Sequence, residues 1–286
     1  MTKHLYHWAI GISLLGLPAA AKAAEASVAP VMSEEAELLE RLGERARQVW
    51  DNLSLVTCTE DLLQEKLNEK GKVVIRSKSS FDYFILLSWD AGKLVMDESR
   101  VEIDPPRKRR PKGALLTTQG FATLLLVVHP EFQTSYSFSL GEKDPATGLT
   151  PLHFVPRNSG PTPGALELSG RTYPITWAGT VWVNRNTAEI IRTEARWYQP
   201  PEQLGLESLS AGVDYAPVKL EERTLQLPQK AKVELSTEHQ WWRNTHTFAG
   251  YRLFSVETNI SIGDDVSENP PSSTGPPTAD GTGEVQ

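Results

Sequence analysis

Residues 68–103, NEKGKVVIRSKSSFDYFILLSWDAGKLVMDESRVEI, hold two extended runs, each preceded by a short turn that ends in glycine. The turns are residues 68–71 and 89–92, and the runs that follow them are 72–87 and 93–103. Glycine supplies the positive φ angle that a tight hairpin connection requires. Another extended run, residues 53–67, precedes the first turn. The stretch therefore predicts three consecutive antiparallel strands.

Later segments alternate apolar and polar residues with the period of a β-strand. The alternation is clear in residues 135–140, 191–197, 208–215 and 230–235. It indicates a sheet with one face on a core and the other in water. Residues 184–187, Asn-Arg-Asn-Thr, predict a turn between two more strands. We expect roughly nine to eleven strands in total.

Two helices are expected beside these strands. Residues 33–53 place their apolar side chains on one helical stripe, which is typical of an amphipathic helix. Residues 114–128 are apolar on all sides in their second half and predict a buried helix that ends at Pro130, although a strand over 122–128 fits as well. The order of elements contains no βαβ alternation, which disfavours the Rossmann and TIM-barrel classes. The fold class is therefore α+β, mainly antiparallel.

The first 23 residues have the layout of a secretory signal peptide. Lys3 begins a short polar start, an apolar run follows over residues 8–20, and Ala21-Lys22-Ala23 offers a cleavage site. Cleavage is expected after Ala23, with Ala24 and Ala26 as alternatives. The apolar run is too short to span a bilayer, so the mature chain is expected to have no transmembrane segment and to be periplasmic or secreted.

The remaining chain divides into a short linker, one domain and a tail. Residues 24–32 form the linker and residues 33–262 the single β-rich domain. The tail, residues 263–286, is rich in Pro, Ser, Gly and acidic residues and has no aromatic residue. Such a segment cannot bury enough apolar surface to offset its ordering entropy, so we expect it to be disordered.

Charge and residue types exclude several classes of function. The whole chain carries a net charge of −7, which makes nucleic acid an improbable partner. One cysteine allows no intrachain disulfide. The histidines after the signal peptide, His129, His153, His239 and His246, match no metal-ligand spacing, so no metal or other cofactor is expected. Nucleophile and phosphate-binding motifs are absent from the sequence as well.

The element order resembles that of periplasmic lipoprotein carriers of the LolA/LolB type. The stretch from Thr57-Cys58-Thr59-Glu60 through Phe81-Asp82-Tyr83-Phe84-Ile85-Leu86 looks like the opening strands of secreted bacterial proteins related to that fold. The likeness covers most of residues 33–260 in element order and rests on no short motif. It implies a strongly curved antiparallel sheet, a half-barrel, that shelters an apolar cavity. It further implies binding of acyl chains or of another envelope partner without covalent chemistry.

Two sets of residues are candidates for binding. A half-barrel needs only an apolar lining to hold an acyl chain, although each candidate lining residue also fits a packed core. These residues are Phe84, Leu86, Phe121, Leu125, Tyr136, Phe138, Trp182 and Trp197. A basic cluster and an aromatic strand are candidates for contact with an anionic membrane surface or an acidic partner. As alternatives, the basic cluster fits a solvated connector and the aromatic strand fits an edge strand. Their residues are Arg107, Lys108, Arg109, Arg110, Lys112, Trp241, Trp242 and Arg243.

The sequence therefore favours an exported, non-enzymatic protein that binds a lipid-like ligand or an envelope partner, as a carrier or chaperone does. A structural or assembly module with a fully packed core is the first alternative. A hydrolase whose site carries no recognisable motif is the second. A continuous apolar cavity would favour the carrier, and a polar cleft that gathers a histidine with two carboxylates would favour the hydrolase.

Overall fold

The computed structural model describes residues 33–53, 55–90, 93–103, 115–118, 121–157, 160–168 and 170–254. The side chains of 86–90, 93–97 and 121–123 are not among those described. The expected signal peptide, the linker, the whole tail and the basic cluster at residues 107–112 lie outside the described residues.

The described chain is mostly antiparallel β-sheet with two α-helices, α1 (Glu34–Leu53) and α2 (Pro130–Gln133), which confirms the α+β class. Two 3₁₀ helices, η1 (Phe121–Val128) and η2 (Glu202–Leu204), accompany them. The strands are β1 (Val56–Asn68), β2 (Val73–Asp90), β3 (Lys93–Ile103), β4 (Tyr136–Leu140), β5 (Thr150–Pro156), β6 (Ala165–Leu168), β7 (Arg171–Pro174), β8 (Trp177–Asn184), β9 (Glu189–Trp197), β10 (Leu206–Leu220), β11 (Arg223–Thr237) and β12 (Gln240–Leu253).

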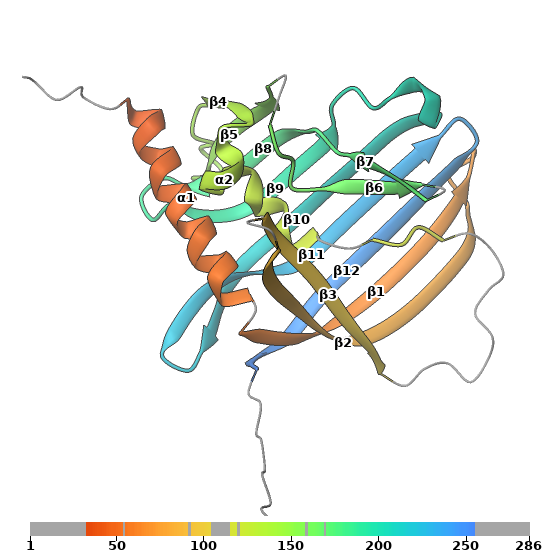
Figure 1. Cartoon of the computed structure of the whole chain (residues 1–286), viewed down its shortest axis with the longest axis horizontal. Coiled ribbons are helices and arrows are strands. Elements are labelled where there is room, and N and C mark those ends of the chain that lie inside the picture. Colours follow the sequence, from red (N-terminus) through yellow and green to blue (C-terminus); the bar gives the residue numbers. More distant parts are fainter. Residues whose placement is uncertain are drawn as a thin grey trace, which may run out of the picture.

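Ten strands form one sheet in the order β3-β2-β1-β12-β11-β10-β9-β8-β5-β4 (Figure 1). Every pairing in it is antiparallel, and β1, β2 and β3 are consecutive neighbours, which confirms the expected meander. The last strand, β12, lies between β1 and β11. Residues from the two ends of the described chain therefore meet in the middle of the sheet.

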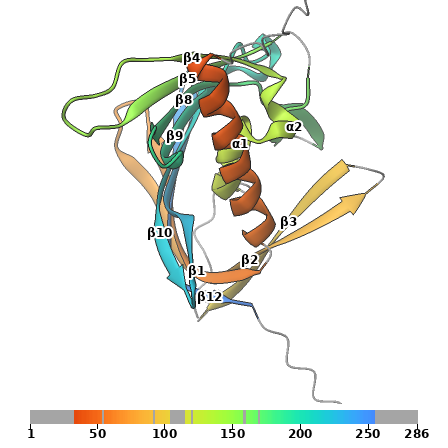
Figure 2. The same cartoon turned by 90° about the vertical axis from the view of Figure 1, so that its left-hand side faces the viewer.

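Helices α1 and α2 lie on one face of this sheet, which we call the inner face (Figure 2). The apolar stripe of α1 is buried there, and Leu42 and Ala46 are fully buried. Leu125, Val127 and Val128 of η1 fill the space between α1 and the strands. Along each strand, every second side chain points to the inner face and packs in this core. Charged side chains occupy the other face.

The second helix differs from the expected one. Residues 115–118 are not helical, η1 is a 3₁₀ helix, and Pro130 begins α2 instead of ending a helix. His129 is the N-cap of α2, where its ring nitrogen accepts a hydrogen bond from the backbone N–H of Glu131. Proline suits this position because the first N–H groups of a helix have no partner within the helix. The apolar half, residues 124–128, is buried as expected.

A small second sheet, β6–β7, is another departure from the expected fold. Its two strands pair with each other and with no strand of the large sheet. Both strands are only four residues long, so their alternation was too short to mark them. The hairpin matters because it forms one wall of the cavity described next.

Candidate functional site

A cavity of about 610 Å³ lies between the inner face of the sheet and the β6–β7 hairpin. Small-molecule pockets span roughly 300–1,000 Å³ and are lined mainly by apolar side chains, so this cavity has the size and chemistry of a ligand site. Its lining consists of Leu115, Leu116, Thr117, Thr118, Ala165, Leu166, Glu167, Leu168, Ile175, Trp177, Leu204, Leu206, Leu209, Val233, Leu235, Thr237 and Trp242.

Cross-strand pairing builds the floor of the cavity. Leu209 of β10 lies opposite Leu235 of β11, and Val233 lies on the same face of β11. All three side chains are buried, whereas their sequence neighbours on these strands point toward the other face. On the hairpin, Leu166 is partly buried and packs against the core. The cavity is therefore bounded by apolar side chains from the sheet on one side and from the hairpin on the other, and it is partly open to solvent.

Residues 115–118 form a further wall, and polar side chains of the sheet fasten them. Gln64 Nε2 donates to the carbonyl oxygen of Leu116 at 2.7 Å, and Asn244 Nδ2 donates to the same oxygen at 2.8 Å. These bonds satisfy a carbonyl that has no strand partner. Gln64 and Asn244 lie opposite each other on β1 and β12, so the sheet register places both amides under this segment.

A cluster of buried polar side chains continues from this wall along the inner face. His246 is 1% exposed and Glu60 0% exposed, and His246 Nδ1 lies 2.6 Å from Glu60 Oε1. On the other side of the ring, His246 Nε2 lies 2.8 Å from the hydroxyl of Thr118. Arg100 binds both oxygens of Glu60, with Nε at 2.5 Å and Nη2 at 3.0 Å. The cluster thus joins a hydroxyl, an imidazole, a carboxylate and a guanidinium in one chain.

The partners of Glu60 keep its carboxyl ionised. Burial raises the pKa of Glu60, but hydrogen bonds from His246 and Arg100 outweigh burial and hold the pKa below its usual value. Arg100 also forms an ion pair with Glu98, whose other oxygen accepts a hydrogen bond from Tyr83. The structure therefore gathers a histidine and two carboxylates within a buried cluster.

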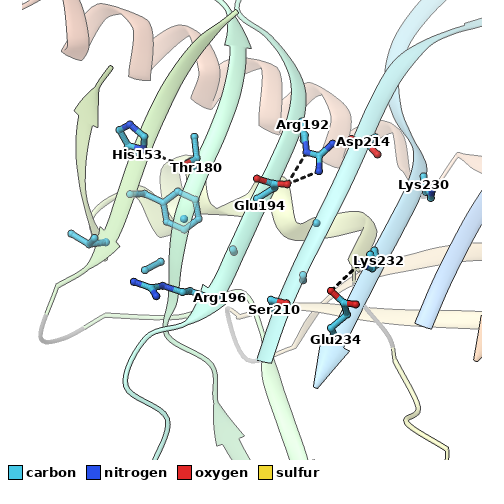
Figure 3. A pocket seen from close by; sticks show the side chains of 17 residues that line it. His153, Thr180, Arg192, Glu194, Arg196, Ser210, Asp214, Lys230, Lys232 and Glu234 are labelled. Carbon is cyan, nitrogen blue, oxygen red and sulfur yellow. Dashed lines mark hydrogen bonds and ion pairs between the residues drawn. The ribbon is translucent and has the colours of Figure 1, made fainter. Parts of the chain in front are cut away.

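The outer face of the sheet carries a second depression, of about 720 Å³ (Figure 3). Its charged side chains are mostly paired: Arg192 with Glu194 on the same strand and with Asp214 on the next, and Lys232 with Glu234 on one strand. These side chains are 43–50% exposed, and ion pairs of this kind contribute about 0–1 kcal/mol. The depression is therefore a solvated outer surface with complementary charges, hollowed where the small residues Ala178 and Gly212 lie.

The described residues also bear on metal binding, on membrane-spanning helices and on the chemistry of the cysteine. No group of three or more His, Cys, Asp or Glu side chains in that part of the chain could hold a metal ion. None of the helices in the described ranges is long and apolar enough to cross a bilayer. Cys58 is buried, and burial raises the pKa of its thiol to about 12, so it remains protonated at neutral pH.

The lining residues expected from the sequence occupy other places. Leu125, Tyr136, Phe138 and Trp197 belong to the core or pack against it. Phe84 stacks on Phe254 with ring centroids 5.7 Å apart. The side chains of Leu86 and Phe121 are outside the description, and Trp182 lies between the buried Val181 and Val183 and so faces away from the core. Of the expected lining residues with described side chains, none lines the 610 Å³ cavity.

The expected aromatic strand, in contrast, reaches the cavity. Trp241 is 45% exposed, whereas Trp242 points to the inner face and lines the cavity. The ammonium group of Lys66 lies 5.3 Å from the Trp242 ring centroid. Arg243 points outward and pairs with Glu65. The two tryptophans therefore face opposite sides of β12, as strand geometry requires.

Sequence reasoning missed Glu60, Thr118 and Asn244 and gave His246 no role. The signal available was the alternation of Asn244, His246 and Phe248 along one face of a strand, which puts polar groups where a core is expected. Buried polar groups require partners, so this pattern pointed to an inward network. Its members are up to 186 residues apart in sequence, which hid the pairing.

Comparison of the chain with models of known protein families gives no match, and a search of curated proteins also gives no match.

Proposed function

We propose that this protein binds a lipid-like hydrophobic ligand in the cavity between the sheet and the β6–β7 hairpin. The observation that carries the proposal is the mainly apolar lining of this 610 Å³ space, which is partly open to solvent. Burying about ten methylenes of an acyl chain there would contribute up to ~8 kcal/mol before the entropy of binding is subtracted.

The proposal includes the finer form of the fold and its location. The ten-stranded sheet is taken to be a half-barrel that bends around α1. Contacts of α1 with both β2 and β9, which are far apart in the sheet order, support this form. In Figure 2, β2 and β3 lie on the other side of α1 from β9 and β10. The signal-peptide layout of residues 1–23 supports a role as a carrier in the bacterial envelope.

Native mass spectrometry of the purified chain, after incubation with phospholipid vesicles, tests this function. We expect one lipid mass per chain. Leu166→Asp should weaken lipid retention at least about tenfold, because a carboxylate in the apolar wall must be desolvated when an acyl chain fills the cavity. Leu166 lies on the short hairpin outside the main sheet, so the variant should keep its fold.

Val74→Asp is the matched control. Val74 is 55% exposed on β2 and lines no described pocket, so the same change of side chain there should leave lipid retention unaltered. A wild-type chain that remains free of lipid after exposure to vesicles would refute the proposal. Equal losses in both variants would show that the cavity is not the binding site.

A further inference from the structure

The buried polar cluster forms a directed chain of hydrogen bonds that ends at the cavity wall. An ionised carboxylate only accepts hydrogen bonds, so the proton of the His246 ring resides on Nδ1, which donates to Glu60. In the neutral ring Nε2 then carries a lone pair and accepts from the Thr118 hydroxyl, 2.8 Å away. Asn244 Nδ2 donates to the same hydroxyl oxygen at 2.8 Å.

This order of groups is that of an activated nucleophile. Nucleophilic catalysis by a hydroxyl requires a base within about 2.6–3.2 Å and a third group that orients the base. The distance from Thr118 Oγ1 to His246 Nε2 is 2.8 Å and that from His246 Nδ1 to Glu60 Oε1 is 2.6 Å, so both fall within this range. The fit is independent of sequence order, because such constellations are recognised by geometry and role.

Strands of the sheet carry the base and the residues that orient it. Glu60 lies on β1 and His246 on β12, adjacent strands in the interior of the sheet. Arg100, on β3, binds the carboxylate with two nitrogens and so fixes its plane. The imidazole is stacked on Phe248, with ring centroids 6.2 Å apart and an interplanar angle of 10°. The base therefore has one defined orientation toward Thr118.

Of Thr118, His246 and Glu60, only Thr118 borders the cavity that would hold the substrate. Thr118 is 5% exposed and lines the 610 Å³ cavity, whereas Glu60 and His246 do not line it. The reaction requires that an acyl chain in the cavity present its ester carbonyl to Thr118. Asn244 Nδ2 donates to that hydroxyl and to the Leu116 carbonyl oxygen, both at 2.8 Å, and so positions Thr118.

We propose that Thr118 is the nucleophile of an acyl-ester hydrolase site, with His246 as the general base, acting on an ester whose acyl chain occupies the cavity. The inference rests on the proposed function, because the cavity must accept the acyl chain. Glu60 is a positioning residue that acts through His246. The substrate class is a carboxylic ester with one apolar acyl chain.

The reaction needs only water as a co-reactant. Thr118 Oγ1 bonds to the ester carbonyl carbon while its proton passes to His246 Nε2. The bond from that carbon to the alcohol oxygen breaks, and the alcohol leaves with the proton from Nε2. Water then attacks the threonyl ester and gives one proton to Nε2. The acid leaves as the proton returns to Thr118 Oγ1.

Reaction of the purified full chain with 4-nitrophenyl octanoate and with an octyl fluorophosphonate tests the site. We expect nitrophenolate release above the rate in buffer and one phosphonyl adduct, which peptide mass analysis should place on Thr118. Thr118→Val should lower the release rate at least about 100-fold, and Thr118→Ser should retain it. Glu60→Gln should lower kcat and change KM less than about twofold, since its effect passes through His246.

Thr172→Val is the matched control. Thr172 is exposed on β7 and lines none of the described pockets, so the same change of side chain there should not alter the rate. Unchanged release by Thr118→Val, or an adduct on another residue, would overturn the inference. If Thr118→Val does not fold, the adduct position and the Thr118→Ser rate decide the question. A wild-type chain that binds octanoate but neither releases nitrophenolate nor forms an adduct refutes the hydrolase alone. A chain that does not bind octanoate either refutes both proposals.

Discussion

Glu60→Ala should lower the free energy of unfolding by about 3–5 kcal/mol, because it removes one partner of a buried ion pair. The carboxylate is fully buried and binds two nitrogens of Arg100 and one of His246. Its removal leaves the Arg100 guanidinium, only 16% exposed, without that partner. Urea unfolding at neutral pH, followed by circular dichroism, measures the change.

Glu44→Ala supplies the control for this prediction. Glu44 pairs with Arg47 on the exposed side of α1, where both side chains are about half exposed. Loss of such a pair should change stability by less than about 1 kcal/mol. A similar loss of unfolding free energy in both variants would show that the buried contacts of Glu60 stabilise the fold no more than an exposed ion pair does.

Gly179→Ala should destabilise the fold by about 3 kcal/mol through overpacking between β8 and β9. A Cβ atom on Gly179 would lie 1.9 Å from the carbonyl oxygen of Glu194 and 2.8 Å from the Cα of Ala195. Both contacts are with backbone, so the two strands would have to separate. Thermal unfolding followed by circular dichroism should show a lower midpoint for the variant.

Gly212→Ala tests whether the destabilisation comes from the lack of space for a Cβ atom and not simply from replacing a glycine in a strand. Gly212 lies on β10, next to β9, and a Cβ there would meet no atom closer than 3.8 Å. Its stability should stay within about 0.5 kcal/mol of the wild type. A Gly179→Ala variant as stable as Gly212→Ala would mean that β8 and β9 do not approach as closely as the structure has them.

Local patterns in the sequence were enough to predict much of the fold. The stripe of α1 and the turns around β2 and β3 depend on neighbouring residues, and the structure places these elements within a few residues of the expected bounds. The turn at residues 184–187 joins β8 to β9 as expected. Hydrophobic periodicity and turn chemistry act over short stretches, which is why they can be recognised without the fold.

The candidate site depends on contacts that no local pattern contains. Leu166 reaches the cavity only because the β6–β7 hairpin packs on the core, and a four-residue strand carries little periodicity. Thr118 meets His246 across 128 residues of sequence, through the pairing of β12 with β1. The expected lining residues were chosen by aromatic and apolar character, and the core needs the same character.

The central claim is that the inner cavity holds an acyl chain, and tryptophan fluorescence tests it directly. Trp177 and Trp242 line the cavity, so dibromostearate should quench emission while stearate should not. A Trp177→Phe, Trp242→Phe double variant should lose most of that quenching, whereas Trp182→Phe, on the other face of β8, should keep it. Quenching that is absent, or that survives in the double variant, would contradict the account.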